Sequence, residues 1–161
     1  RCSAARPKIA NYPFTTLTPV LGIVELSGFR RFVMADIPGL IEGAHEGAGL
    51  GHDFLKHIER TRILLHVLDI FPSDDSDPVD NYHKIRNELA LHSEELIRKP
   101  EVVVLNKADL DPEGLFCEDI KTRLGDADDV FVISAVSGQG LTELNERLWT
   151  IVKGKDKQDE F

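Results

Sequence analysis

The stretch Val102-Val103-Val104-Leu105-Asn106-Lys107-Ala108-Asp109 places a polar tetrad directly after four consecutive apolar residues. A continuous apolar run is typical of a strand in a parallel sheet, because helices cover both faces of such a sheet. In open α/β sheets, ligands bind outside the carboxyl ends of the strands, which is where this tetrad would lie. The stretch therefore predicts an α/β domain with a mainly parallel sheet and a binding site at the edge of that sheet.

The segments around this stretch alternate between short apolar runs and longer periodic stretches, as α/β domains do. Three further runs predict buried strands: Phe32–Ala35, Ile63–Ile70 and Val130–Ile133. A strand over Leu21–Leu26 precedes the turn signal Ser27-Gly28, so we expect it to form a hairpin with Phe32–Ala35. The helices expected between and after the strands cover Asp53–Glu59, Asp77-Pro78 to Lys99-Pro100, Pro112–Leu124 and Leu141–Val152.

Composition narrows the class of protein. Of the 161 residues, 42% are hydrophobic and 29% are charged, which excludes a disordered tail, a collagen-like fibre and a disulfide scaffold. Since no run approaches the ~20 apolar residues of a membrane span, we expect a soluble, cytoplasmic protein. The formal net charge of −9 argues against a general nucleic-acid-binding surface but leaves room for a local basic patch.

The tetrad Asn106-Lys107-Ala108-Asp109 has the chemistry to recognise guanine. The carboxylate of Asp109 only accepts hydrogen bonds, and guanine offers two adjacent donors where adenine presents an acceptor. The Lys107 stem can lie against the flat base, and the Asn106 amide can bond to the base edge and to neighbouring loops. The alternative interpretation of the tetrad is a polar helix cap that follows a strand.

A second motif, Ser134-Ala135-Val136, follows the strand expected over Val130–Ile133 and would emerge at the same edge of the sheet. Backbone N–H groups of such a turn can bond to the carbonyl oxygen of guanine, and the small Ala135 allows the backbone to approach. Taken alone, the motif could equally be a tight turn without a ligand.

Two more motifs suit a magnesium ion and a terminal phosphate. Asp36-Ile37-Pro38-Gly39 follows the strand Phe32–Ala35, so Asp36 can hold magnesium through water and the Gly39 amide can approach a phosphate. The alternative for this segment and the glycine-rich residues 43–51 is a flexible loop. A threonine hydroxyl of Phe14-Thr15-Thr16-Leu17-Thr18 can complete the magnesium shell, and chemistry alone leaves open which of the three threonines does so.

Together these motifs resemble the G domain of the Obg (Spo0B-associated) GTPases, a class of the Ras-like P-loop NTPases. The stretches 3–19, 32–51 and 57–62 carry the specific part of the resemblance, whereas Asn106–Asp109 and Ser134–Val136 are generic to the superfamily. The resemblance implies a G domain over residues 1–152, with 153–161 as a charged tail or linker.

The resemblance also implies roles for individual residues. Phe14–Thr18 corresponds to the first switch, with Thr16 on magnesium, and Asp36–Gly39 to the second switch, with Asp36 facing magnesium and the γ-phosphate. Asn106–Asp109 reads guanine with assistance from Ala135. Leu40 stands where many Ras-like enzymes carry a catalytic glutamine, so slow hydrolysis is expected because an apolar side chain cannot orient water. The implied protein binds GTP, GDP and Mg²⁺, acts as a monomeric switch in assembly of the large ribosomal subunit, and is a GTPase.

The sequence departs from the family pattern because it contains no Gly-x-x-x-x-Gly-Lys-[Ser/Thr]. We expect the chain to begin within the first helix of the G domain, with the first strand and the phosphate-binding loop missing. On that expectation, a central strand is missing between Phe32–Ala35 and its neighbour in the sheet, and the chain binds GTP weakly. The alternative function is a non-catalytic interaction module that presents the switch surface to a partner.

Several other residues are expected to have structural roles only. The spacing of His45, His52 and His57 does not indicate a metal site, and Cys2 and Cys117 are expected to be reduced thiols. His66 is expected to be a hydrogen-bonded core histidine and Trp149 a packing residue. The acidic run Asp74, Asp75, Asp77 and Asp80 is explained by turn chemistry and helix capping.

Overall fold

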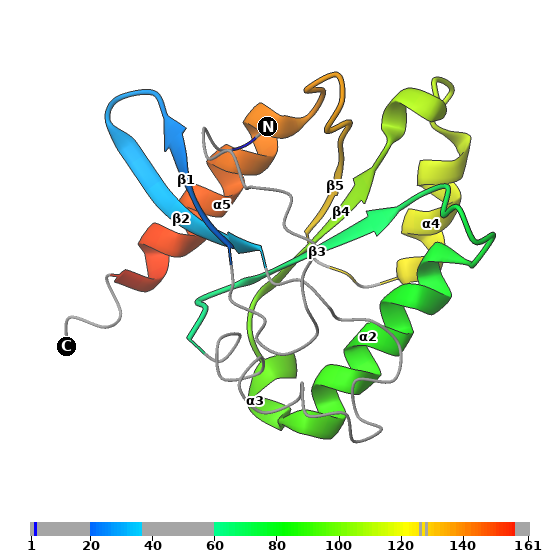
Figure 1. Ribbon diagram of the computed structural model, residues 1–161, viewed down its shortest axis with the longest axis horizontal. Coiled ribbons are helices and arrows are strands. Elements are labelled where there is room, and N and C mark those ends of the chain that lie inside the picture. Colours follow the sequence, from blue (N-terminus) through cyan, green and yellow to red (C-terminus); the bar gives the residue numbers. More distant parts are fainter. Residues whose placement is uncertain (1, 3–19, 37–59, 126, 128, 157–161) are drawn as a thin grey trace.

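The computed structural model describes residues 2, 20–36, 60–125, 127 and 129–156 of the chain (Figure 1). The described strands and helices are β1 (Val20–Leu26), β2 (Arg30–Asp36), β3 (Leu64–Asp69), α2 (Pro78–His92), α3 (Glu94–Ile97), β4 (Glu101–Asn106), the 3₁₀ helix η1 (Ala108–Leu110), α4 (Leu115–Leu124), β5 (Val130–Val132) and α5 (Leu141–Asp156). The strands form a parallel sheet in the order β3-β4-β5 and an antiparallel hairpin of β1 and β2. The predicted α/β class is therefore confirmed.

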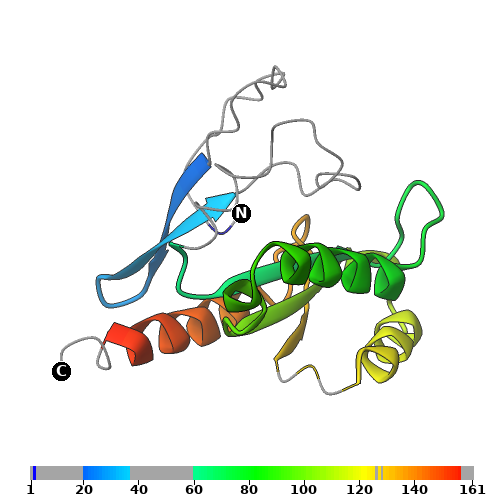
Figure 2. The same ribbon diagram turned by 90° about the horizontal axis from the view of Figure 1, so that it is seen from below.

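Strand β4 is the centre of the parallel sheet. The side chains of Val102, Val104 and Leu105 have no exposed surface, and that of Val103 is 2% exposed. Because successive side chains of a strand point to opposite faces, Val103 and Leu105 pack into one cluster and Val102 and Val104 into another. The first cluster is completed from α2 and α4, and the second from α5 and the hairpin. Figure 2 shows α5 running beneath the hairpin.

The hairpin and β3 are less buried than predicted. We expected Phe32–Ala35 and Ile63–Ile70 to be buried throughout, but Val33 is 63% exposed and Val67 is 52% exposed. In β2 only the face that carries Phe32 packs against the core. The opposite face, which carries Val33, is exposed, as is common for an antiparallel sheet that is covered on one side. Among the described residues, no strand pairs with both β2 and β3.

The helix predicted between Asp77 and Pro100 is in fact two helices. Asp77 caps α2 as expected, since its carboxylate accepts hydrogen bonds from the N–H groups of Val79 and Asp80. The prediction of one continuous helix is wrong, because Ser93 adopts an extended conformation with φ −159° and ψ 128°. The Ser93 hydroxyl accepts from the N–H of Glu95 and so caps α3, an alternative to the helical hydrogen bond that serine readily takes.

Other element ends differ by a few residues from the predictions. Helix α4 begins at Leu115 rather than Pro112, because the buried Asp111 carboxylate accepts a hydrogen bond of 2.9 Å from the N–H of Cys117 in the first turn. Helix α5 continues to Asp156, past the predicted end at Val152 and into the expected tail. Strand β3 begins one residue late and ends one residue early, and β5 ends at Val132.

Trp149 and Asp74 have the structural roles that we expected. Trp149 packs against the core cluster of α5, and Asp74 bonds to Ser76 in a turn. The expected helix Asp53–Glu59 and the three histidines 45, 52 and 57 lie outside the described residues. Within the described ranges, no helix is long and apolar enough to cross a membrane, and no three His, Cys, Asp or Glu residues are placed to share a metal ion.

A buried polar cluster closes the end of the sheet where β4 begins. The Glu101 carboxylate lies 3.1 Å from each of the His66 Nδ1, the Tyr82 hydroxyl and the Arg86 Nη1. His66 is thus a hydrogen-bonded core histidine, as expected. Burial opposes ionisation of Glu101, but its bonds to His66 and the charge of Arg86 outweigh this and lower the pKa of the carboxyl. Burial, together with the charge of Glu101, raises the pKa of Tyr82.

We predict that Glu101→Gln lowers the free energy of unfolding by about 1–3 kcal/mol at neutral pH, because it removes the charged acceptor shared by the buried His66 and Tyr82 and the partly exposed Arg86. Since the pKa of Glu101 is lower in the folded than in the unfolded chain, the carboxylate stabilises the fold above its unfolded pKa of 4.5 and loses this effect as the pH falls further. Urea denaturation from pH 7 to 3 measures both effects, and the free energy of unfolding of the variant is expected to depend less on pH than that of the wild-type protein.

The matched control is Glu94→Gln, which breaks an exposed ion pair with Arg98 and is expected to change stability by less than about 0.5 kcal/mol. Equal effects of the two substitutions would contradict the prediction.

Candidate functional site

The carboxyl ends of β3, β4 and β5 form one edge of the parallel sheet (Figure 1). Strand β4 ends at Asn106 and leads into η1, while β5 ends at Val132 and leads into the loop before α5. Because the three strands are parallel and in register, the polar residues that follow them meet at this edge. The structure thus brings together the two motifs that the sequence predicted to be neighbours, Asn106–Asp109 and Ser134–Val136.

Two hydrogen bonds join the loops after β4 and β5. The Asn106 Oδ1 accepts a bond of 3.0 Å from the N–H of Ala135, and the N–H of Ala108 donates to the carbonyl oxygen of Ile133 over 3.0 Å. Ala108 is buried at this junction, which leaves no space for a large side chain. The tetrad is therefore anchored to the neighbouring loop at two points.

The carboxylate of Asp109 is oriented by a buried hydroxyl. Ser134 Oγ donates to Asp109 Oδ1 over 2.5 Å and accepts from the N–H of Ser137 over 3.1 Å. Ser134 has no exposed surface, whereas Asp109 is exposed. A carboxylate has two oxygens and about four lone-pair sites, so Asp109 retains acceptor capacity toward solvent. The arrangement presents a fixed acceptor at the sheet edge.

Asp69, at the end of β3, is a site residue that the sequence reasoning missed. Its Oδ2 lies 2.6 Å from the Lys107 Nζ, and its Oδ1 accepts from the N–H of Phe71 over 3.0 Å. Lys107 itself has a left-handed backbone, with φ 76° and ψ 31°. A signal was present in the sequence, because Asp69 interrupts the apolar run Ile63–Ile70 near its carboxyl end. We had no reason from the sequence to connect it with Lys107.

The loop between β5 and α5 is compact. The N–H of Ser134 donates to the carbonyl of Gln139, and the N–H of Gly138 donates to the carbonyl of Ser134. Gly140 closes the loop with φ +72°, and a Cβ at this position would lie 2.4 Å from the carbonyl oxygen of Val132. Only glycine fits this close approach. Val136, at the outside of the turn, is 72% exposed.

Of the residues predicted for magnesium and phosphate, the structure describes Asp36 alone. Asp36 is exposed at the end of β2, in the hairpin rather than in the sheet that carries Asn106 and Asp109. The segments Phe14–Thr18 and Ile37–Gly39, and with them Thr16, lie outside the described residues, as does Leu40. Their roles stay predictions.

Comparison with known proteins identifies the family. A model of the family described as 50S ribosome-binding GTPase matches residues 1–107. The chain is 56% identical over 151 residues to the GTPase Obg of Caldanaerobacter subterraneus and 55% identical over 152 residues to that of Chloroflexus aurantiacus, alignments that cover 91% and 94% of this chain. Each covers 34% of the relative, so the chain spans about a third of the length of these curated relatives.

Solved structures with low sequence identity share the fold. The structure of Era in complex with MgGDPNP and nucleotides 1506–1542 of 16S ribosomal RNA has a TM-score of 0.61 at 21% identity, covering 89% of this chain and 47% of that one. That of nucleolar GTP-binding protein 1 from Plasmodium falciparum has a TM-score of 0.55 at 15% identity, covering 86% and 72%. The expected Ras-like G-domain fold and the resemblance to Obg GTPases are confirmed. The chain belongs to the family of 50S ribosome-binding GTPases.

Proposed function

We propose that this chain supplies the guanine-reading part of an Obg-type switch protein that binds GTP and GDP and hydrolyses GTP slowly. The observation that carries the proposal is the pair of side chains fixed at the sheet edge, Asn106 by the Ala135 N–H and Asp109 by the Ser134 hydroxyl. Both are held by neighbouring atoms of the protein, so little ordering is needed when a base binds.

In the proposed complex, Asp109 accepts hydrogen bonds from the ring N–H and the exocyclic amine of guanine. Adenine presents an acceptor to the same carboxylate, and two acceptors that face each other without water are unfavourable. The Lys107 stem lies along the base while Asp69 holds its ammonium group, and Ala135 acts by fixing Asn106. Specificity then depends on Asp109, and affinity on the fixed Lys107.

The phosphate end of the proposed site rests on the family resemblance. The hydroxyl of Thr16 and the carboxylate of Asp36 are hard oxygen donors of the kind that Mg²⁺ prefers, and the exposed Asp36 at a strand end fits such a role. Bound Mg²⁺ would neutralise charge on the phosphates. Phe14–Thr18 and Asp36–Gly39 act as the two switches, and Leu40 in place of glutamine accounts for slow hydrolysis. The family description supports a large-subunit ribosome partner. We further propose that the protein acts as a cytoplasmic monomer.

We predict that Asp109→Asn, made in the complete switch protein, weakens GTP binding by about 10- to 100-fold and strengthens binding of xanthosine triphosphate, because an amide donor replaces one acceptor and matches the extra carbonyl of xanthine. Titration with fluorescent analogues of both nucleotides measures the change. The control is Asp119→Asn, an exposed carboxylate on α4 whose loss is expected to change neither affinity. Unaltered guanine preference in the Asp109 variant would exclude the proposed role.

We predict that Asp69→Asn weakens binding of guanine and xanthine nucleotides alike, by about two- to tenfold, because Lys107 loses the charge that immobilises it. The same titrations distinguish this effect from that of Asp109, since selectivity between the two bases is expected to stay constant. Glu118→Gln is the matched control, because it breaks an exposed ion pair with Lys121 on α4. Wild-type affinity of the Asp69 variant would show that the ion pair has no part in binding.

A further inference from the structure

The turn between β1 and β2 presents an aromatic ring to solvent. Phe29 is completely exposed, at 104% of its reference surface, and its backbone lies in the left-handed region with φ 59°. The preceding Gly28 is also left-handed, with φ 75°. Hairpin turns with two such residues favour glycine or asparagine, whereas a bulky side chain is strained in this conformation. The turn therefore holds a strained phenylalanine whose ring gains no packing within the described structure.

Arg30 makes this turn rigid. Its Nε donates to the carbonyl of Ser27 over 2.8 Å, and its Nη2 donates to the Ser27 hydroxyl over 3.1 Å. The same guanidinium forms a bidentate ion pair with Glu146 on α5, with N–O distances of 2.6 and 2.7 Å. The turn is thus tied to a long helix, which fixes the position from which the backbone presents Phe29.

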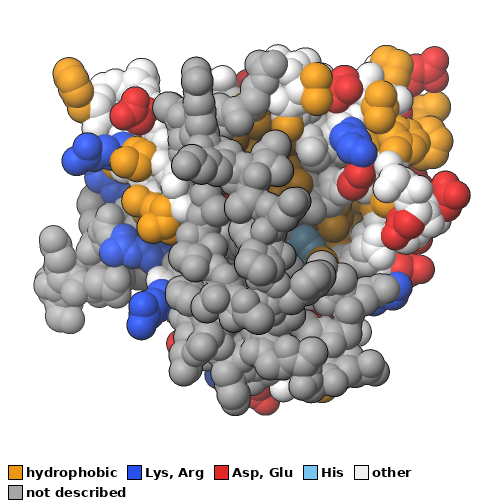
Figure 3. Space-filling model, in the orientation of Figure 1, with side chains coloured by type: hydrophobic (Ala, Val, Ile, Leu, Met, Phe, Trp, Pro, Cys, Tyr) orange, Lys and Arg blue, Asp and Glu red, His pale blue; other side chains and the backbone are white. Residues whose placement is uncertain are grey.

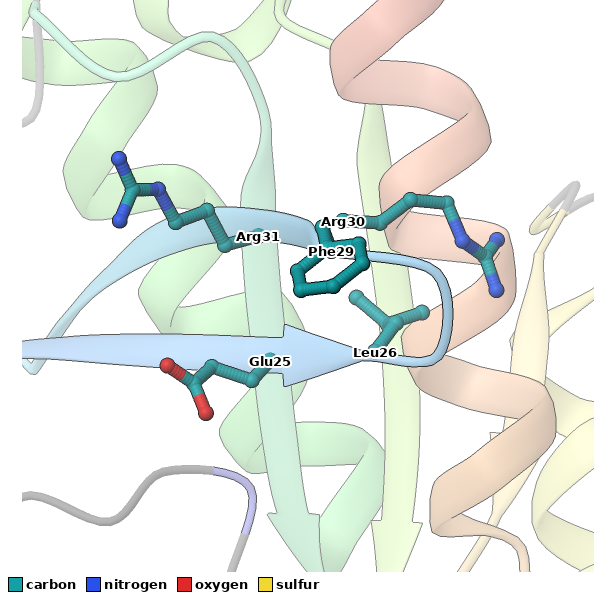
Figure 4. A pocket seen from close by; sticks show the side chains of 5 residues that line it. All are labelled: Glu25, Leu26, Phe29, Arg30 and Arg31. Carbon is teal, nitrogen blue, oxygen red and sulfur yellow. The ribbon is translucent and has the colours of Figure 1, made fainter.

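An open hollow of about 460 Å³ lies beside the ring, lined by Glu25, Leu26, Phe29, Arg30 and Arg31 (Figure 4). Arg30 extends toward α5, whereas Arg31 extends to the opposite side of the hairpin. Arg31 and its cross-strand neighbour Glu25 are both exposed, and neither forms an ion pair among the described residues. Arg31 and Glu25 are therefore the charged groups beside the ring that a ligand can bind.

The distribution of charge also favours binding of an anionic ligand on the side of the hairpin. Although the chain carries a net charge of −9, Lys and Arg side chains gather on the side of the hairpin, at the left of Figure 3. Asp and Glu side chains gather at the opposite side, where α4 carries the exposed Glu118 and Asp119. A polyanion would approach the hairpin side and be repelled from the α4 side.

We propose that Phe29 stacks on an unpaired base of ribosomal RNA, with Arg31 on an adjacent phosphate and Glu25 accepting from an exocyclic amine of the base. Recognition of single-stranded RNA commonly combines an aromatic platform with arginine and with acceptors for base edges. The hollow beside the ring is lined by Leu26 and by three charged residues, Glu25, Arg30 and Arg31, so its lining suits a polar, charged ligand better than an apolar one. This proposal rests on the proposed function, from which it takes the ribosome as the partner. It adds which side chains contact the ribosomal RNA.

The test compares Phe29→Gly with the wild-type protein. Glycine relieves the left-handed strain and removes the ring, so a thermal melt is expected to show unchanged or higher stability. The probe is a fluorescein-labelled single-stranded RNA of about ten nucleotides containing all four bases, followed by fluorescence anisotropy at low and moderate salt. We expect Phe29→Gly to weaken binding about tenfold and Phe29→Trp to retain it. Arg31→Ala is expected to reduce the salt dependence by about one released counterion.

The matched control is Phe116→Ala, which removes another exposed phenylalanine, 56% exposed, on the acidic α4. It is expected to leave RNA binding unchanged. Wild-type RNA affinity of Phe29→Gly, or no RNA binding by the wild-type protein at low salt, would overturn the proposal. So would a loss of binding to purified large ribosomal subunits without a loss of RNA binding, because the ring would then contact a ribosomal protein. Binding to purified large ribosomal subunits, measured beside the RNA titration, separates the two failures. Wild-type subunit binding by Phe29→Gly would count against this proposal, whereas no subunit binding by the wild-type protein would count against the proposed function.

Discussion

Burial of β4 on both faces is the constraint on which the rest of the structure depends. Val102, Val104 and Leu105 have no exposed surface, so helices must cover the strand from two sides. A buried strand must also pair its backbone groups along both edges, which β3 and β5 do. Because all three strands run parallel, the residues that follow them gather at one edge. The position of the candidate site is thus a consequence of how the core is closed.

Hydrogen bonds between the loops that follow β4 and β5 orient the polar side chains at this edge. Ser134 is a polar residue without exposed surface, and its hydroxyl is satisfied by Asp109 and by the N–H of Ser137. The same bonds that satisfy a buried group therefore orient an exposed carboxylate. Asp69 acts similarly on Lys107 from the next strand. Fixed donors and acceptors of this kind are what selective binding of a flat, polar base requires.

The hairpin differs from the parallel sheet because only one of its faces is covered. Phe32 packs toward the core while Val33 is largely exposed, and the turn between the strands is held by Arg30 and Glu146 instead of by apolar packing. The proposed guanine site and the proposed RNA contact thus lie on separate sheets of one chain. Helix α5 packs against both, since its residues Leu144 and Leu148 share a cluster with Val104 of β4 and Phe32 of β2. It is therefore the helix that contacts both sheets.

The sequence by itself determined the α/β class, the central strand and the pairing of Asn106–Asp109 with Ser134–Val136. These features depend on local patterns: an apolar run that needs two covered faces, and polar groups placed directly after strands. The capping of α2 by Asp77 was predictable for the same reason. That Asp69 holds Lys107 and that Val33 is exposed depend on which distant segments supply a partner or cover a face, and hydrophobic periodicity carries no information about that. The break at Ser93 is local, because its hydroxyl caps α3, but the spacing of apolar residues does not reveal it.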